Sequence, residues 1–167
     1  DVPRFDPLSA IRGAVAHVAI GDPQGDFVRL RAQELSADWA RIADRDPAGT
    51  AIVHGDLHQD NVLLTGDGAI LTDLELAGAG PPSYDAAPAV VMVERYGADR
   101  ATLEAFLAAQ GRDPRSWSGF VTCLAVYELW VTAWSVGVRD RSPELAAEAA
   151  VRIGCLRDQT CEPWRLL

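Results

Sequence analysis

Two histidines, two aspartates and an asparagine lie close together in the segment AIVHGDLHQDNVLL at residues 51–64, between two runs of aliphatic residues. His54 and His58 are two of only three histidines in the chain, so this segment concentrates groups that can bind ligands or carry protons. Loops held between rigid strands commonly carry binding and catalytic side chains. The segment is therefore the first place to look for chemistry.

Three oxygen-bearing side chains around this loop could form one site: Asp56, Asn61 and, further along the chain, Asp73. Residues 61–65 and 69–75 have the apolar pattern of two strands joined by the turn GDG, which predicts a hairpin. The start of its first strand and the end of its second meet at one edge, so Asn61 and Asp73 should be neighbours. One amide and one carboxylate suit Mg²⁺, which takes few protein ligands. Asp56 is placed to accept a proton from an incoming hydroxyl.

The rest of the chain predicts the elements that position this loop. Residues 50–54 have the pattern of a short strand before it, and residues 78–88 form a Gly/Pro-rich loop after it. Caps and apolar spacing predict six helices, over residues 7–20, 25–44, 85–96, 99–110, 115–138 and 142–158. The expected fold class is mainly α with a small β part (α+β), in which helices surround a small β-hairpin carrying the polar loop.

Composition and charge exclude several classes of protein. The chain has 167 residues, 49% hydrophobic and 23% charged, which fits a single domain over residues 1–167. The net charge of −9 argues against a nucleic-acid partner, because phosphates require basic patches. The longest apolar stretch, residues 119–138, carries Glu128 and predicts a buried helix, not a membrane span.

Targeting and cysteine signals are also weak. The first twenty residues lack the basic and apolar regions of a signal peptide. Cys123, Cys155 and Cys161 are odd in number and have no CxxC spacing, which predicts neither a disulfide framework nor a zinc cluster. A cytoplasmic protein with no membrane partner fits these features best.

The polar loop carries a resemblance to a known family. HGDLHQDN resembles the catalytic loop of the aminoglycoside phosphotransferase and choline kinase-like family, whose His-Gly-Asp-x-x-x-x-Asn parallels the His-Arg-Asp-x-x-x-x-Asn of protein kinases. ILTDLE is similar to the metal-binding strand that follows it, and GAGPPSYDAA to the family's Gly-Asp-Pro-x-x-Asp segment without its first acidic residue. The three motifs cover residues 51–88 in family order. They imply the C-terminal lobe of a protein-kinase-like fold.

The resemblance implies a reaction and its cofactors. Asp56 would be the catalytic base or hydroxyl-orienting group, and Asn61 and Asp73 would hold the magnesium ions that bridge the phosphates of ATP or GTP. The acceptor would be a hydroxyl of a small molecule, such as an aminoglycoside, another antibiotic or a metabolite. The expected activity is therefore O-phosphotransfer by a small-molecule kinase.

Other residues of the motifs have supporting roles in this interpretation. Gly55 lets the backbone turn tightly, and His54 is expected to bond the nearby main chain. His58 either steadies the metal-binding aspartate through a hydrogen bond or makes a polar loop contact without catalytic weight. Asp85 is expected to anchor the following helix and the loop.

The acceptor pocket is harder to locate in the sequence. The stretch AVYELWVTAW places Tyr127, Trp130 and Trp134 on one helical face and Glu128 beside them. A carboxylate with aromatic walls would suit a cationic acceptor. The alternative is an aromatic core stripe in which Glu128 is paired with a neighbouring arginine.

Two parts of a complete kinase are missing from the sequence. It has no G-x-G-x-x-G loop to cover the nucleotide, and all fifteen basic residues are arginine, so no lysine can pair with the phosphates. Because the chain also begins at Asp1, we expect an N-terminal nucleotide lobe to be absent from it and the chain alone to have little activity.

Two other functions fit parts of the pattern. A kinase-like lobe without activity could serve as a binding or interaction module. GDLH also partly matches the Gly-Asp-x-His motif of dinuclear metallophosphatases, but such sites draw several histidines from separate loops, and only His17 lies outside the segment.

Overall fold

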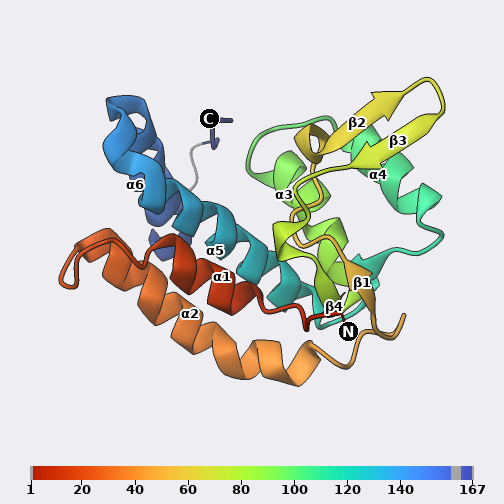
Figure 1. The fold of residues 1–167 in the computed structure, drawn as a ribbon, viewed down its shortest axis with the longest axis horizontal. Coiled ribbons are helices and arrows are strands. Elements are labelled where there is room, and N and C mark those ends of the chain that lie inside the picture. Colours follow the sequence, from red (N-terminus) through yellow and green to blue (C-terminus); the bar gives the residue numbers. More distant parts are fainter. Residues whose placement is uncertain (1, 159–162, 167) are drawn as a thin grey trace.

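The computed structural model describes residues 2–158 and 163–166. The described residues form six α-helices: α1 (Pro7–Ala14), α2 (Pro23–Ile42), α3 (Ala87–Glu94), α4 (Arg100–Ala109), α5 (Phe120–Val138) and α6 (Pro143–Asp158). They also form four short strands: β1 (Ala51–Val53), β2 (Val62–Thr65), β3 (Gly68–Leu71) and β4 (Gly78–Gly80). The expected class, mainly helical with a small β-hairpin, is confirmed (Figure 1).

Helix α5 is the element against which most others pack. It contacts α1, α2, α3 and α6, and it runs through the middle of the molecule in Figure 1. A helix surrounded in this way can be apolar on nearly every side, and its buried Thr132 and Ser135 satisfy their hydroxyls on carbonyl oxygens of their own helix. With the turn that follows, α5 is long and apolar enough to cross a membrane, but half of its apolar window is buried inside the protein, as in core helices generally. The prediction of a buried helix here is confirmed.

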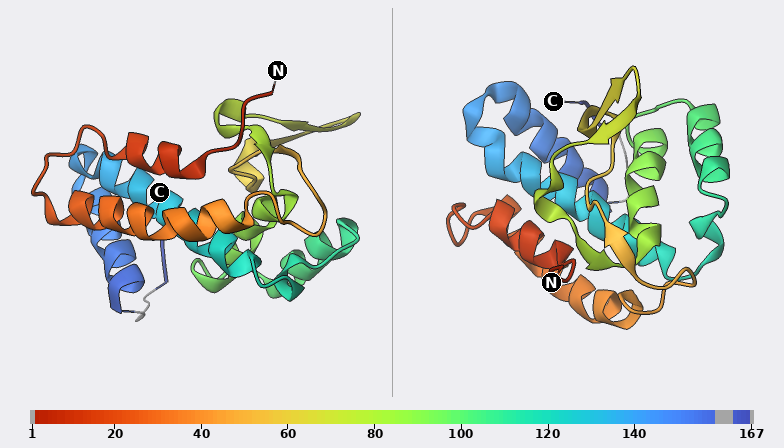
Figure 2. Two further views of the ribbon diagram at one scale, coloured as in Figure 1. Left: turned by 90° about the horizontal axis from the view of Figure 1, so that it is seen from below. Right: turned by 45° about the vertical axis from the view of Figure 1, so that its right-hand side comes forward.

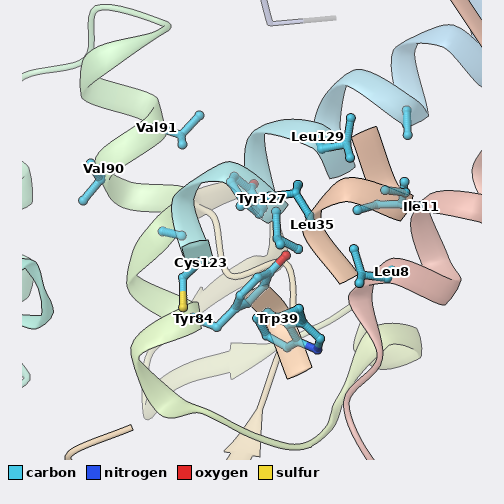
Figure 3. Packing of buried hydrophobic residues seen from close by; sticks show 14 of the residues in the cluster. Leu8, Ile11, Leu35, Trp39, Tyr84, Val90, Val91, Cys123, Tyr127 and Leu129 are labelled. Carbon is cyan, nitrogen blue, oxygen red and sulfur yellow. The ribbon is translucent and has the colours of Figure 1, made fainter. Parts of the chain in front are cut away.

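Four aromatic rings connect the N-terminal segment to the centre of α5. Phe5, Trp39 and Tyr84 meet edge to face, with ring centroids 4.7 to 5.8 Å apart. Tyr84 then meets Tyr127 at 6.2 Å. Figure 3 shows Trp39, Tyr84 and Tyr127 in the buried cluster between α2, α5 and the segment before α3. Such edge contacts add to the area buried and hold the rings in fixed orientations.

The strands form two separate antiparallel pairs. In the hairpin β2–β3, Val62 is opposite Leu71 and Thr65 is opposite Gly68, as the sequence predicts. The hairpin stands apart from the helices in both views of Figure 2, and Leu64 at its tip is largely exposed. The second pair, β1–β4, joins residues on either side of the hairpin.

Strand β4 lies in the Gly/Pro-rich segment that the sequence predicts as a loop. It pairs with β1 on one side, and the N-terminal segment runs along its other side: the N–H of Phe5 donates to Ala79 and the N–H of Ala79 donates to Pro3. A Cβ atom on Gly78 would lie 2.7 Å from the nitrogen of Phe5, so the glycine permits this approach. Only the tertiary partner makes the segment a strand.

Two helix boundaries differ from the prediction for identifiable reasons. Helix α1 ends at Ala14, not at residue 20, and the chain continues in turns whose carbonyl oxygens at Val15 and Val18 accept hydrogen bonds from the guanidinium of Arg29 on α2. Helix α5 begins at Phe120, not at residue 115, because residues 114–116 form a 3₁₀ turn. Apolar periodicity does not predict the contact of Arg29 with the residues after α1, which lie 11 and 14 positions earlier in the chain.

The cysteines also depart from expectation. Cys123 is a free, buried thiol on α5, and burial raises its pKa to about 12. Cys155 on α6 is disulfide-bonded, which the cysteine spacing does not predict.

An ion pair ties the start of α2 to the end of α5. Asp22 caps α2 by accepting the N–H groups of Gln24 and Gly25, and its carboxylate also binds the guanidinium of Arg139 at 2.6 Å. The hydrogen bond from Arg139, followed by that from Gly25, lowers the pKa of Asp22 from 3.8 to about 2. The ionised form is thus the one that the fold stabilises.

This linkage gives a pH-dependent prediction. Because the pKa of Asp22 is lowered in the folded state, its contribution to stability is full above the ordinary value of 3.8 and is lost as the pH falls toward 2. Asp22→Asn should therefore lower the free energy of unfolding at pH 7 and flatten its decline between these pH values. Asp22→Ala should cost about 1 kcal/mol more, since the cap is also lost.

Urea unfolding at several pH values measures this effect. Asp140→Asn is the matched control, because Asp140 also contacts Arg139, at 3.7 Å, but its side chain is 94% exposed. Equal effects of the two asparagine variants would contradict the role of Asp22.

Candidate active site

A cavity of about 470 Å³ lies between the polar loop and the helices. Its walls come from the polar loop, the segment after β3, the end of α3, and the helices α5 and α6. The lining residues include Asp56, His58, Asp60, Asn61, Asp73, Met92, Tyr96, Tyr127, Trp130, Trp134, Arg152 and Leu166. All three oxygen-bearing side chains predicted for the site therefore face one cavity.

The turn before Asp56 is held by a carboxylate from another part of the chain. Asp85 accepts the backbone N–H groups of His54 at 2.8 Å and Gly55 at 2.9 Å. Burial raises the pKa of Asp85, and these two hydrogen bonds oppose that rise by stabilising the carboxylate. The turn requires glycine at position 55 for two reasons. Its φ is +88°, which other residues rarely adopt, and a Cβ atom there would lie 2.8 Å from the ring of Phe5.

His54 connects the loop to the segment that carries Asp73. Its Nδ1 atom accepts the N–H of Asp56 at 3.3 Å, and its Nε2 atom lies 2.8 Å from the carbonyl oxygen of Thr72. The ring is buried and bonded at both nitrogens to the main chain. The imidazole of His54 therefore joins the polar loop to the segment that carries Asp73, through contacts with the main chain.

Asn61 and Asp73 lie at the same edge of the hairpin, as the strand pattern predicts. The N–H of Thr72 donates to the carbonyl oxygen of Asn61 at 3.0 Å, next to the last pair of the β2–β3 ladder. The amide nitrogen of Asn61 donates to the carbonyl oxygen of Asp56 at 2.9 Å and to His58 at 3.1 Å. With the nitrogen engaged, Oδ1 is the atom that Asn61 can offer to a ligand.

Asp73 has the left-handed backbone conformation, with φ of 59° and ψ of 54°. Residues other than glycine rarely adopt it, although aspartate and asparagine do so more often than most. Strand β3 ends at Leu71, four residues before the end of the predicted range, and the carboxylate of Asp73 lies in the cavity wall.

The side chains of Asn61 and Asp73 can offer one amide and one carboxylate oxygen to a metal ion. Within residues 2–158 and 163–166, no group of three or more His, Cys, Asp or Glu side chains is placed to hold a metal ion. A dinuclear metallophosphatase site needs such a group, and His17 binds the carbonyl oxygen of Gly137 outside this cavity. Mg²⁺ takes few protein ligands and prefers oxygen, so the set of Asn61 and Asp73 fits it.

His58 contacts the asparagine and not the aspartate of this pair. Its Nε2 atom accepts from the amide of Asn61 and lies 3.9 Å from a carboxylate oxygen of Asp56. The predicted hydrogen bond from His58 to the aspartate is therefore corrected: His58 bonds Asn61 instead.

The carboxylate of Asp56 is bonded from helix α5. The hydroxyl of Tyr127 donates to Oδ1 at 2.9 Å, and the indole nitrogen of Trp130 donates to Oδ2 at 3.3 Å. Burial raises the pKa of Tyr127 well above its ordinary value, and the negative charge of Asp56 raises it further. Tyr127 therefore remains a protonated donor at neutral pH.

Of the other two residues predicted for the acceptor pocket, one lines the cavity and one does not. Trp134 lines the cavity and is 42% exposed. Glu128 is not among the residues that line it, because its carboxylate is paired with Arg95. The prediction that Glu128 meets a cationic acceptor is therefore corrected, and the alternative in which an arginine satisfies it describes the structure.

Sequence reasoning missed the contribution of α6 to the cavity. Arg152 is buried, forms an ion pair with Glu148 at 2.8 Å, and lies over the rings of Tyr96 and Trp164. The i,i+4 spacing of Glu148 and Arg152 is visible in the sequence. That Arg152 of this pair lines the cavity and is not exposed to solvent depends on how α6 packs on α5.

Comparison with solved structures identifies the fold. The choline kinase LicA from Streptococcus pneumoniae has a TM-score of 0.58 at 17% identity, covering 91% of this chain and 56% of its own. Its complex with AMP gives 0.59 at 17% identity, with 92% and 55% covered. A choline/ethanolamine kinase family protein from Mesorhizobium loti gives 0.59 at 24% identity, with 93% and 55% covered. The fold is part of a kinase-like fold, and the chain spans a little over half the length of these proteins.

The family follows from the sequence match. The chain belongs to the phosphotransferase enzyme family, whose model matches residues 5–120. The resemblance carried by the polar loop is thereby confirmed. No curated protein matches the chain.

The anchoring of the loop by Asp85 gives a second prediction. Asp85→Ala would leave the N–H groups of His54 and Gly55 without their acceptor, which should lower the free energy of unfolding by about 2 kcal/mol or more. Asp85→Asn retains one acceptor oxygen and should cost less. Thermal and urea unfolding measure both variants, and a stability of Asp85→Ala equal to the unsubstituted chain would refute the anchoring role.

Proposed function

We propose that this chain is the catalytic and acceptor-binding lobe of an O-phosphotransferase that acts on a small-molecule hydroxyl. The observation that carries the proposal is that Asp56, Asn61 and Asp73 line one cavity whose opposite wall is aromatic. Membership of the phosphotransferase enzyme family supports the same reaction class. A nucleotide-dependent reaction of this kind is expected in the cytoplasm, where its donor is made.

Asp56 is the group that receives the acceptor hydroxyl in this proposal. Its carboxylate lines the cavity and accepts two hydrogen bonds from α5, so its orientation is fixed before a ligand arrives. A carboxylate of this kind can align the hydroxyl for attack and take its proton.

Asn61 and Asp73 are proposed to hold Mg²⁺ with ATP or GTP as the phosphoryl donor. The bound ion would neutralise charge on the phosphate oxygens. The bracing by His54 keeps the asparagine and aspartate segments at a constant separation, because this ring bonds both the loop and Thr72.

The nucleotide lobe is proposed to lie outside this chain. The chain spans 55% to 56% of the solved structures that it resembles, and its sequence has neither a glycine-rich nucleotide loop nor a lysine. Activity is therefore expected only from a protein that also contains such a lobe.

The acceptor is proposed to enter along the aromatic wall of the cavity, past Tyr96 and Trp134. A cationic group would find ring faces there and not the carboxylate of Glu128. The hydroxyl must reach Asp56 at the inner end of this wall.

Substitution of the base tests the reaction. Asp56→Ala in the protein with its nucleotide lobe should lower kcat at least about a hundredfold, because the aligning carboxylate is lost, while Mg-nucleotide binding is retained. Phosphoryl transfer from ATP and GTP to a panel of hydroxylated amines, sugars and antibiotics measures it. Asp67→Ala, in the exposed hairpin turn, removes the same charge as a control. Unchanged turnover in Asp56→Ala would sink the assignment.

Substitution of the metal ligand gives a separate test. Asp73→Ala should raise the Mg²⁺ concentration needed for half-maximal nucleotide binding by about tenfold or more. The matched control is Glu75→Ala, which removes an exposed carboxylate two positions away that does not line the cavity. An identical Mg²⁺ titration for the two variants would count against Asp73 as a ligand. A complete protein that binds Mg-nucleotide but transfers nothing would instead be the non-catalytic binding module.

A further inference from the structure

We infer that the aromatic face of α5 is divided in function. Tyr127 and Trp130 are positioning residues that hold the carboxylate of Asp56, and Trp134, one helical turn later, is the residue that contacts the acceptor. The inference rests on the proposed function for its kinetic part, but its structural part can be tested without any reaction.

The polar loop holds the backbone of Asp56 but not its carboxylate. The N–H of Asp56 is bonded to His54 and its carbonyl oxygen to the amide of Asn61. The carboxylate oxygens have a different environment: the nearest ring nitrogen of His58 is 3.9 Å from Oδ1, beyond a hydrogen bond. Rotation of this side chain about its own bonds is therefore not limited by the loop.

Helix α5 supplies one donor to each carboxylate oxygen. The hydroxyl of Tyr127 lies 2.9 Å from Oδ1 and the indole nitrogen of Trp130 lies 3.3 Å from Oδ2. The two donors are three residues apart and so lie on the same side of the helix. A carboxylate bonded at both oxygens to one rigid helix has a single orientation.

Neither donor competes with Asp56 for the proton of the acceptor. An indole N–H can only donate, and the hydroxyl of Tyr127 stays protonated because burial and the charge of Asp56 both raise its pKa. An ionised carboxylate has about four acceptor positions, so two donors leave room for the acceptor hydroxyl. The contacts thus orient the base without blocking it.

The positions of the donors are themselves fixed by the core. Tyr127 is 4% exposed and packs edge to face on Tyr84, which continues into the aromatic cluster with Phe5 and Trp39. Groups held by packing of this kind keep their rotamers when a ligand binds. Tyr127 is therefore suited to positioning and poorly suited to contact with a variable acceptor.

Trp134 has the opposite properties. It lines the same cavity four residues after Trp130, yet 42% of its surface is exposed. It also borders a second hollow beside His17 and Gly137, so its ring separates two openings of the surface. An exposed indole at the mouth of the cavity can stack on an acceptor or adjust to it.

The first experiment observes the indole N–H resonances of this 167-residue chain by NMR. Trp130→Phe identifies the resonance of Trp130 among the five tryptophans, and the other four report whether each variant is folded. Asp56→Asn should shift the Trp130 resonance, because a neutral amide replaces the charged acceptor. The control Asp60→Asn, which removes an exposed neighbouring charge, should leave it in place. A Trp130 resonance that does not respond to Asp56→Asn would overturn the inference.

The second experiment compares kinetic constants in the protein with its nucleotide lobe. Tyr127→Phe and Trp130→Phe should each lower kcat about tenfold, the size expected for a hydrogen bond to a charged group, with the KM of the acceptor nearly constant. Trp134→Leu should raise that KM about tenfold with kcat nearly constant. Trp117→Phe, a tryptophan outside this cavity, should change neither.

The two experiments fail in distinguishable ways. If all three cavity variants changed KM alone, the division of the helix face would be overturned even with transfer intact. If the unsubstituted protein transferred no phosphoryl group, the proposed function would fail, and with it the kinetic roles. The NMR result would in that case still decide whether Trp130 holds Asp56.

Discussion

The two hydrogen bonds from the backbone of His54 and Gly55 to the carboxylate of Asp85 are the constraint on which the candidate site depends. They hold the segment before α3 against the turn that precedes Asp56. That turn requires glycine at position 55, because a Cβ atom there would clash with the ring of Phe5. A buried carboxylate is costly unless it is bonded, and here the backbone supplies the bonds. The main-chain position of Asp56 thus depends on a residue twenty-nine positions later in the chain.

The candidate site combines groups from the exposed hairpin with groups from the buried helix α5. Asn61 and Asp73 stand at the base of an exposed hairpin, and the ring of His54 ties their segments together. The donors to Asp56 stand on α5, the most buried helix of the protein. Asp56, which is proposed to orient the acceptor, is therefore held by the core of the protein. Asn61 and Asp73, which are proposed to hold the metal and nucleotide, lie beside the exposed hairpin.

The other acidic side chains near the site are engaged in holding the fold. Glu128 on α5 is paired with Arg95, which follows α3, and Glu148 is paired with Arg152 within α6. Buried pairs of this kind add little net stability, but removing one partner would leave an uncompensated charge. The use of arginine throughout suits them, since its planar donor group also stacks on aromatic rings such as Trp164. The carboxylates free for chemistry are those of the loop and of Asp73.

The sequence by itself identified the reactive groups Asp56, Asn61 and Asp73 and placed Asn61 and Asp73 at one edge of the hairpin. It could do so because loop motifs and strand alternation are local patterns of residue type and spacing. It predicted the six helices and the neighbourhood of Asn61 and Asp73 for the same reason. Only the tertiary structure decided which face of α5 meets Asp56 and that Glu128 turns to Arg95. It also made a strand of Gly78–Gly80 beside Phe5. These outcomes depend on contacts between residues far apart in the chain, which no local pattern contains.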